Sequence, residues 1–303
     1  MRYVLAGASG FLGRALRARL TRAGHEVTRL VRREPRGPDE VQWDPARGRL
    51  DGRVLEGADA VVNLAGASIG RIPWTRSYRE TLVSSRVDTT GTLARELANL
   101  SDPPVFVVQS ASGYYGKERG DDELDEDSPP GTGFLADLVH RWEQAAEPAE
   151  RAGVRVVWLR TAVVLDRSGG IFPLMLLPFR FGLGGRLGSG RQFMPLVSLR
   201  DWVEVVPFVV ERTESHGAYN VTLPEPATNA DLTAAIGAAL GRPTPLRVPA
   251  PLIRLALGEL SGELVGSVRL RPRRLLAEGF AFRDPDVQSL VRAGLHQTEP
   301  GPA

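Results

Sequence analysis

The fold of this chain follows from the stretch GASGFLG, residues 7–13. A short apolar run at residues 3–6 precedes it, and apolar residues at helical spacing follow it as far as Leu20. This order predicts a strand, a tight turn and a helix. Glycines in such a turn let backbone amides approach a pyrophosphate that lies on the start of the helix. The stretch therefore favours dinucleotide binding over a turn of purely structural purpose.

Apolar and β-branched runs recur along the first half of the chain and alternate with helical segments. The runs lie at residues 26–32, 41–43, 59–64, 105–110 and 154–165, and the longer helical stretches at about 74–100 and 135–152. Runs that are apolar throughout are typical of parallel strands buried on both faces. We therefore predict an α/β protein with a doubly wound parallel sheet of the Rossmann type.

The amino-acid composition of the sequence changes after Asp166. Glycine and proline are dense through residues 169–195, and only short helical segments follow, near residues 201–211, 229–240 and 251–257. This change predicts two domains. A dinucleotide-binding domain would cover residues 1–165, and a smaller substrate or lid lobe would cover residues 166–303.

The composition excludes several classes of protein. The chain has 303 residues, of which 42% are apolar and 24% charged, as in soluble globular proteins. It has no cysteine, so disulfides, thiolate nucleophiles and cysteine-ligated zinc are excluded, and its histidines show no metal-ligand spacing. Basic and acidic residues number 38 and 36, and the densest charge run, residues 121–127, is acidic and is expected to be a solvated loop. We therefore predict neither a metal site nor a nucleic-acid partner.

The sequence also bears on location and partners. No apolar stretch reaches the roughly 18 residues of a membrane span. The first predicted strand begins at Arg2, with no charged and apolar regions of a signal peptide before it. We therefore expect a cytoplasmic protein with no membrane partner, which acts on a small-molecule substrate. The sequence leaves the oligomeric state open.

The end of the second predicted strand indicates which nucleotide is bound. NAD-specific folds place a carboxylate there on the ribose 2′-hydroxyl, whereas NADP-specific folds accommodate the 2′-phosphate with an arginine. This chain has Arg32 and Arg33 at that point, and its first acidic residue is Glu34. Arginine is common throughout, because Lys117 is the only lysine among the 38 basic residues. The two adjacent arginines nevertheless favour NADP(H) as the cofactor.

Motifs spread over nearly the whole chain resemble those of the atypical short-chain dehydrogenase/reductases, in the epimerase-like family with a distinctive C-terminal segment. They include NLAG at residues 63–66, SASGYYG at 110–116, PFRFGLGG at 178–185 and GFAF at 279–282. The resemblance implies an extended short-chain dehydrogenase fold, NADP(H) as cofactor and a C-terminal lobe over the nicotinamide, but no particular substrate. It also implies a set of cofactor-binding residues: Gly7, Ser9, Gly10, Phe11, Leu12, Arg32, Leu64, Ala65, Gly66 and Arg86.

The chain departs from this family pattern at two places. Short-chain dehydrogenases ordinarily use a tyrosine and a lysine four residues later, whose ammonium lowers the pKa of the phenol. Lys117 is the only lysine and Gly113 stands four residues before it, so this dyad is absent. Residues 133–138, where the family's catalytic helix would carry the tyrosine, read GFLADL. The second departure is Ser198, where relatives tend to have a histidine.

Four hydroxyl groups near the end of the fifth predicted strand are the candidates for catalysis: Ser110, Ser112, Tyr114 and Tyr115. Ligands of a doubly wound sheet bind at this edge, where a tyrosine can donate a proton and a serine can orient a carbonyl group. The alternative is structural. One tyrosine would pack under the nicotinamide, the other would close a turn, and the serine hydroxyls would satisfy local backbone groups.

Other charged residues carry weaker hypotheses. Arg180, Arg186 and Arg191 either clamp an anionic group of the substrate or are simply solvated. His140 has no matched acid or metal-ligand partner in the sequence, so a surface or core position is expected.

Two functions from different classes remain. The first is an NADP(H)-dependent oxidoreductase or epimerase-like enzyme that acts on a small polar substrate. The alternative is a non-catalytic NADPH-binding sensor or regulatory module that kept the fold and lost the dyad. The missing tyrosine–lysine pair favours the module, whereas the long glycine-rich lobe favours the enzyme. A sugar epimerase proper would require a phenol base that this sequence does not place.

Overall fold

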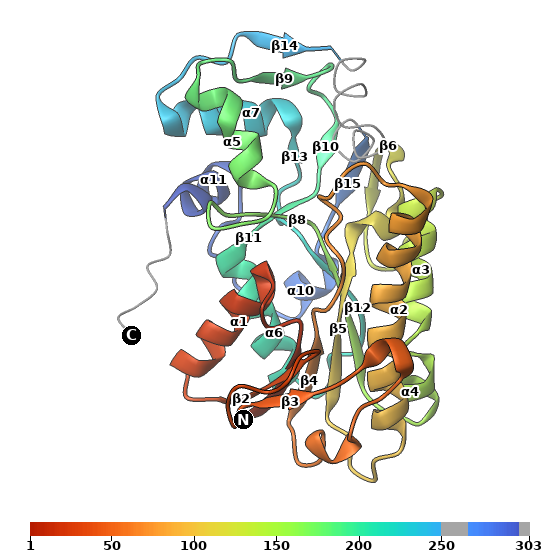
Figure 1. Ribbon diagram of the computed structural model, residues 1–303. Helices are drawn as coiled ribbons and strands as arrows, with labels where there is room; N and C mark the ends of the chain where they lie inside the picture. Colours follow the sequence, from red (N-terminus) through yellow and green to blue (C-terminus); the bar gives the residue numbers. More distant parts are fainter. Residues whose placement is uncertain (250–265, 297–303) are drawn as a thin grey trace.

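A seven-stranded parallel sheet forms the centre of the computed structural model, which describes residues 1–249 and 266–296 (Figure 1). In spatial order, its strands are β12 (Gly217–Val221), β7 (Val156–Thr161), β5 (Val105–Ala111), β4 (Ala60–Asn63), β1 (Arg2–Ala6), β2 (Glu26–Val31) and β3 (Glu40–Gln42). The chain moves outward from β1 to β3 and then returns to β4 on the other side of β1. The strand order therefore reverses between β1 and β4, and the predicted doubly wound sheet is confirmed.

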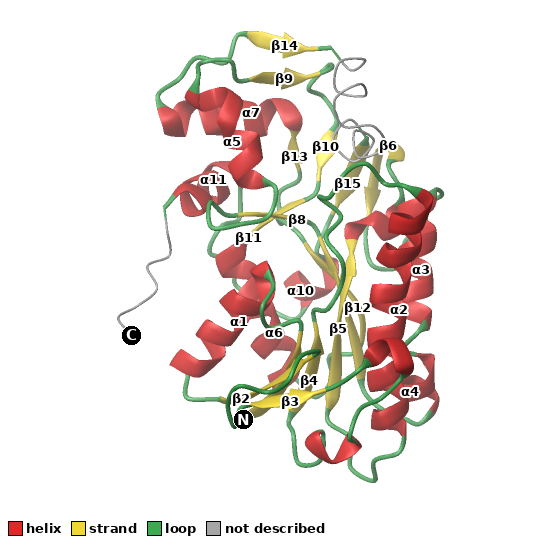
Figure 2. Ribbon diagram, in the orientation of Figure 1, coloured by secondary structure: helices red, strands yellow, loops and turns green. Residues whose placement is uncertain are grey.

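Helices cover both faces of this sheet (Figure 2). One face carries α1 (Phe11–Arg22) and α6 (Leu199–Glu211), and the other carries α2 (Arg76–Ala98), α3 (Phe134–Gln144) and α4 (Glu147–Arg151). Alternate residues of β1 show the division, because Tyr3 and Leu5 pack with α1 and α6 while Val4 and Ala6 pack with α2 and α3. The strands are thus buried on both faces, which explains their continuous apolar character.

Two segments predicted as single elements are divided in the structure. The predicted helix over residues 135–152 consists of α3 and α4, because Pro148 lacks an amide hydrogen and stands in the first turn of a new helix. The predicted strand over residues 154–165 consists of β7 and β8 (Val163–Leu165). Strand β8 leaves the sheet and pairs in parallel with β11 (Leu196–Ser198).

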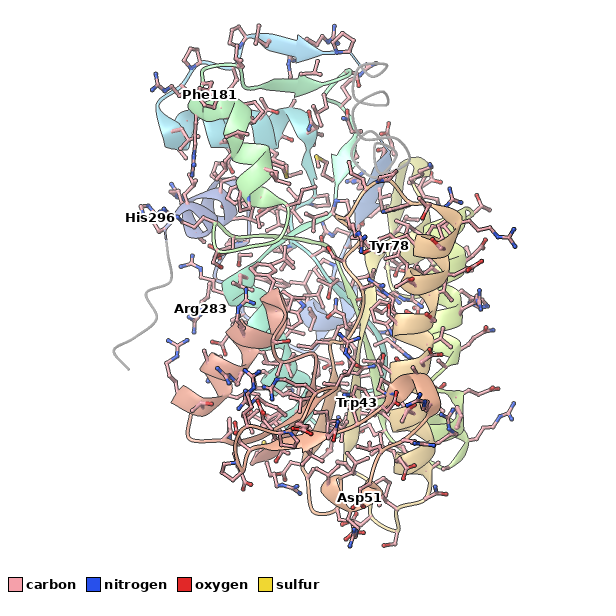
Figure 3. All side chains as sticks on the ribbon, viewed as in Figure 1. Trp43, Asp51, Tyr78, Phe181, Arg283 and His296 are labelled. Atoms are coloured by element: carbon pink, nitrogen blue, oxygen red, sulfur yellow. The ribbon has the colours of Figure 1, made fainter. Side chains whose placement is uncertain are left out.

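The smaller lobe lies beyond the end of β7, where β8 begins (Figure 1). Its other elements are α5 (Phe172–Arg180), β9 (Gly185–Leu187), β10 (Phe193–Met194), β13 (Ala227–Thr228), α7 (Asn229–Leu240), β14 (Leu246–Val248) and α11 (Val287–Leu295). Their shared core includes Phe172, Leu196, Ile236 and Leu290. The side chain of Phe181 lies exposed on the outer end of the lobe (Figure 3).

Segments from the second half of the chain also return to the sheet. Strand β12 forms one edge beside β7, and α6 buries Trp202 against the sheet. The division predicted after residue 165 stays a prediction, because β8 lies outside the seven-stranded sheet and the later segments α6 and β12 return to it. The helix predicted near residues 251–257 lies outside the described residues.

The structure corrects in part the prediction that the acidic run at residues 121–127 is a solvated loop. Residues 121–124 form the end of β6 (Glu118–Leu124), although the side chains of Asp121, Asp122, Glu123 and Asp127 are exposed. Strand β6 pairs in parallel with β15 (Ser267–Leu270), and α10 (Arg273–Ala277) follows β15. Short 3₁₀ helices occur at η1 (Pro45–Arg47), η2 (Gly52–Val54) and η3 (Ser112–Tyr115). No helix in the described ranges is long and apolar enough to cross a membrane.

Candidate functional site

The glycine turn after β1 packs so closely on neighbouring backbone that side chains would not fit. Gly7 has a φ of +79°, and a Cβ added there would lie 2.6 Å from the carbonyl oxygen of Leu64. A Cβ on Gly13 would lie 2.2 Å from the carbonyl oxygen of Gly7. The first turn of α1 therefore rests directly on the loop, and both contacts require glycine.

The N-terminus of α1 presents backbone donors at this turn. Gly10 is the N-cap residue, and its amide donates to the carbonyl of Gly7 over 3.0 Å. Within the described residues no side chain caps α1, its first turn has no acidic residue, and Ser9 is exposed. The amides of Phe11 and Leu12 begin a helix whose positive dipole end attracts an anion. The arrangement fits the pyrophosphate of a dinucleotide.

The ring of Phe11 joins the glycine turn to the lobe. A Cβ added to Gly169 would lie 2.5 Å from Cδ2 of Phe11, and one added to Gly170 would lie 3.3 Å from its Cε1. The loop before α5 therefore lies against the start of α1. The lobe thus borders the candidate cofactor site.

The turn after β4 lies beside the glycine turn. Leu64 donates its amide to the carbonyl of Ala6 over 2.9 Å, which continues the pairing of β4 with β1. The buried side chain of Asn63 accepts the amide of Ala65 over 3.1 Å and donates to Thr90 over 2.9 Å. These bonds hold the turn that carries Leu64 and Ala65 in one conformation.

Arg86 is a buried cation held against this second turn. Its guanidinium donates to the carbonyls of Leu82 over 2.9 Å and Ala67 over 3.0 Å, and it lies 5.0 Å from the ring centre of Trp142. A Cβ on Gly66 would lie 3.2 Å from its Cζ. Burial lowers the pKa of Arg86 to about 10, so the group stays charged at neutral pH. No carboxylate in the described part of the chain pairs with it, so its charge is available to an anion at this turn.

The two adjacent arginines after β2 have different surroundings. Arg33 donates to both carboxylate oxygens of Glu40, over 2.6 and 2.7 Å. Glu40 also accepts the amide of Arg36 over 2.7 Å, and the hydrogen bond from Arg33 lowers the pKa of Glu40 to about 2. Arg32 is exposed and has no partner among the described residues. The structure thus leaves Arg32, and not Arg33, free to meet a phosphate.

Tyr114 and Tyr115 lie on η3 at the carboxyl end of β5. Tyr115 is fully buried, and its Oη donates to Oδ1 of Asn220 over 2.7 Å and accepts from Nη1 of Arg160 over 3.1 Å. Burial raises the pKa of Tyr115 to about 12. Tyr114 is half-buried, and its ring centre lies 3.4 Å from Cζ of Arg160.

Arg160 and Glu143 form a buried ion pair beside this turn. Nε of Arg160 donates to Oε1 of Glu143 and Nη2 donates to Oε2, both over 3.0 Å. The hydroxyl of Ser110, which is fully buried, donates to the same Oε1 over 2.6 Å. The ion pair therefore connects β7, α3 and the end of β5.

The four hydroxyls singled out by the sequence thus divide into two pairs. Those of Ser110 and Tyr115 are engaged in buried hydrogen bonds. Those of Ser112 and Tyr114, on half-buried side chains, have no hydrogen-bond partner within residues 1–249 and 266–296. The catalytic role of each of the four stays a prediction, and Ser112 and Tyr114 are the two that the geometry leaves available.

Three residues of this network, Arg160, Glu143 and Asn220, are not indicated as site residues by the chemistry of the sequence motifs. Arg160 interrupts an apolar strand, and a charge in a buried strand requires a partner, which was the available signal. Asn220 had no such signal, since it lies 105 residues from Tyr115 in the sequence.

The remaining candidates occupy structural or exposed positions. His140 is exposed on α3, and Arg180, Arg186 and Arg191 are exposed on the lobe. Ser198 is the N-cap of α6, where its Oγ accepts the amide of Asp201 over 3.1 Å. No group of three or more acidic or histidine side chains in the described residues is placed to hold a metal ion.

The fold and this site define a dinucleotide-binding α/β protein. The sequence matches the NAD dependent epimerase/dehydratase family over residues 3–222 and a domain of unknown function, DUF1731, over residues 248–293. The chain therefore belongs to the NAD dependent epimerase/dehydratase family, and the resemblance noted in the sequence is confirmed.

Its relatives match over nearly the whole chain. Epimerase family protein Mb2239 from Mycobacterium bovis is 41% identical over 299 residues, which are 98% of each chain. The crystal structure of human epimerase family protein SDR39U1 (isoform 2) with NADPH has a TM-score of 0.88 at 35% identity and covers 97% of this chain and 99% of that one. The nucleoside-diphosphate sugar epimerase from Corynebacterium glutamicum has a TM-score of 0.81 at 32% identity and covers 97% of this chain and 58% of that one.

Proposed function

We propose that this chain binds NADPH and is an NADP(H)-dependent oxidoreductase or epimerase-like enzyme that acts on a small polar substrate. The cofactor proposal rests on one observation. The N-terminus of α1, which no described side chain caps, follows β1, and Arg32, which has no partner among the described residues, follows β2, the strand that pairs with β1. The backbone amides of Ser9, Phe11 and Leu12 would hold the pyrophosphate, and Arg32 would pair with the 2′-phosphate. The NADPH bound by the human relative supports this assignment.

The other predicted cofactor residues form the walls of the same site. Gly7 and Gly10 let the backbone approach the ligand closely, and the turn of Leu64, Ala65 and Gly66 borders them across β1 and β4. Arg86 holds this turn through the carbonyl of Ala67, and its charge favours an anionic ligand.

The proposed chemistry is reduction of a carbonyl group. Bound NADPH supplies the hydride that adds to the carbonyl carbon. The protein must then supply a proton to the oxygen that gains negative charge, and the free hydroxyls of Tyr114 and Ser112 are the donors that the structure offers. Lys117 is exposed at the turn before β6, so we expect no ammonium group to assist the donor and the reaction to be slow.

Two measurements test the proposal. Calorimetric titration with NADPH and NADH should show tighter binding of NADPH. A screen of carbonyl compounds that follows NADPH consumption should then find a substrate. For that substrate, Tyr114→Phe or Ser112→Ala should lower turnover by about a hundredfold while NADPH binding stays intact.

The absent tyrosine–lysine dyad supports a second candidate, a non-catalytic NADPH-binding sensor or regulatory module. This candidate predicts tight NADPH binding with no carbonyl compound reduced. It also predicts that Tyr114→Phe and Ser112→Ala bind NADPH like the parent protein. Reduction of any compound that depends on one of these two hydroxyls would exclude it.

A further inference from the structure

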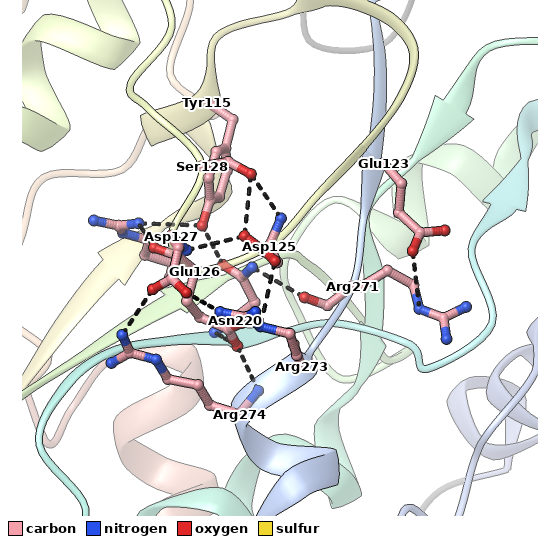
Figure 4. Close-up of polar contacts among 11 residues, drawn as sticks. Tyr115, Glu123, Asp125, Glu126, Asp127, Ser128, Asn220, Arg271, Arg273 and Arg274 are labelled. Carbon is pink, nitrogen blue, oxygen red and sulfur yellow. Dashed lines mark hydrogen bonds and ion pairs between the residues drawn. The ribbon is translucent and has the colours of Figure 1, made fainter.

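The C-terminal segment, defined here as the described residues 266–296, matches part of a domain of unknown function and is anchored at two separate places. At the first, β15 pairs with β6, and arginines after it meet the acidic run (Figure 4). Arg273 pairs with Asp125 over 3.3 Å and also with Asp127, which Arg274 contacts over 3.0 Å. At the second, Asp284 pairs with Arg200 of α6.

Backbone groups of the first anchor satisfy buried polar side chains. The side-chain amide of Asn220 on β12 donates to the carbonyl of Arg271 over 3.0 Å. Oε1 of Glu126 accepts the amides of Asn220 over 3.0 Å and Arg274 over 3.3 Å. Asn220 is fully buried and Glu126 is buried, so without the C-terminal segment these groups would lose partners that water would have to replace.

A continuous chain of contacts leads from Asn220 to the candidate site. Oδ1 of Asn220 accepts the hydroxyl of Tyr115 over 2.7 Å, and that hydroxyl accepts from Arg160 over 3.1 Å. The guanidinium of Arg160 lies 3.4 Å from the ring centre of Tyr114, and the two tyrosine rings meet edge to face at 5.1 Å. Asn220, Tyr115 and Arg160 are buried, and the two hydrogen bonds among them each occupy a specific donor and acceptor. The two ring contacts then place Arg160 and Tyr115 directly against the Tyr114 ring.

We propose that the C-terminal segment positions Tyr114, with Asn220 as the positioning residue that connects the two. The segment then does more than cover the protein, because its backbone completes the network that orients the candidate proton donor. Only the consequence for turnover rests on the proposed function; the orientation of Tyr114 is a property of the free protein.

Fluorine NMR of the full chain labelled with 3-fluorotyrosine tests the orientation directly. The chain has five tyrosines, and Tyr114→Phe and Tyr115→Phe assign their two resonances. Asn220→Ala removes the acceptor for Tyr115 and the donor to Arg271, and should shift or broaden the Tyr114 resonance. Asp284→Asn weakens the second anchor of the same segment and serves as the matched control, since it should lower the melting temperature and leave that resonance in place.

Two further results decide the proposal. If Asn220→Ala does not fold, Tyr115→Phe breaks the same chain with almost no change in shape, and it should also move the Tyr114 resonance. An unchanged Tyr114 resonance in Asn220→Ala, or in Tyr115→Phe where the first variant is unfolded, overturns the proposal, as does an equal shift in Asp284→Asn.

The kinetic readout separates this inference from the proposed function. Once a substrate has been identified, Asn220→Ala should lower kcat about tenfold to a hundredfold, as expected when the proton donor Tyr114 is misplaced. KM and the affinity for NADPH should be retained. A loss of NADPH affinity equal to the loss of kcat would indicate general damage and contradict positioning. If the parent protein reduces no carbonyl compound, the proposed function fails while the NMR result still decides whether the segment orients Tyr114.

Discussion

Replacing Arg32 by alanine should weaken the binding of NADPH and leave the binding of NADH unchanged. The side chain is exposed directly after β2, and its removal breaks no hydrogen bond or ion pair with any of the described residues. NADPH and NADH differ only in the 2′-phosphate, and of the two adjacent arginines after β2 only Arg32 is not engaged by a carboxylate among the described residues. The change should therefore appear as a loss of nucleotide selectivity without a loss of stability.

The magnitude follows from the kind of contact. A hydrogen bond to a charged group contributes about 1.5–3 kcal/mol, and about 1.4 kcal/mol corresponds to a tenfold change in Kd. Because Arg32 is exposed, solvent and salt screen the pair, and we take the lower end of this range. We therefore expect about a tenfold increase in the Kd of NADPH at low salt, and a smaller one at higher ionic strength.

Isothermal titration calorimetry with both nucleotides at two salt concentrations is the assay, and Arg33→Ala is the matched control. Arg33 stands next in the sequence but donates to Glu40 over 2.6 and 2.7 Å, so its loss should lower the melting temperature and spare selectivity. Equal affinity of the parent protein for NADPH and NADH would refute the reasoning. So would a selectivity that depends on Arg33 and not on Arg32.

Three other expectations concern catalysis, folding and pH. For any carbonyl compound that the protein reduces, Tyr114→Phe should lower turnover more than Ser110→Ala does, because the hydroxyl of Ser110 is buried and donates to Glu143. The reverse order in an NADPH-consumption assay would contradict Tyr114 as the proton donor. Residues 166–303 expressed alone should show no cooperative melt by circular dichroism, because α6 and β12 bury their apolar side chains against the sheet; a sharp transition would count against this. Glu40→Gln should lower the melting temperature at neutral pH. The difference in melting temperature between this variant and the parent should shrink as the pH falls from about 4.5 to about 2, because a carboxyl with a lowered pKa stabilises the fold only while it is ionised. A difference that stays constant across this pH range would exclude that role.

The acidic run illustrates where sequence patterns mislead. Seven residues that are nearly all acidic lack an apolar period, so a solvated loop was the natural interpretation of residues 121–127. In the folded protein three of these acids, Glu123, Asp125 and Asp127, pair with arginines between residues 269 and 274, and β6 pairs with β15. Charge compensation from a distant segment replaces the missing apolar face.

The sequence by itself determined the doubly wound sheet, the glycine turn and the presence of arginine after β2. These features are local, because a strand, a tight turn and an N-terminal helix end are encoded within a few neighbouring residues. Only the tertiary structure decided which arginine is free and which hydroxyls are engaged. Glu40, which accepts hydrogen bonds from Arg33, lies on the next strand. Glu143, the partner of Ser110, lies 33 residues away in the sequence, and Asn220, a partner of Tyr115, lies 105 residues away. Whether a polar side chain is available for chemistry depends on which distant residues the fold brings beside it, and the local sequence pattern does not predict those partners.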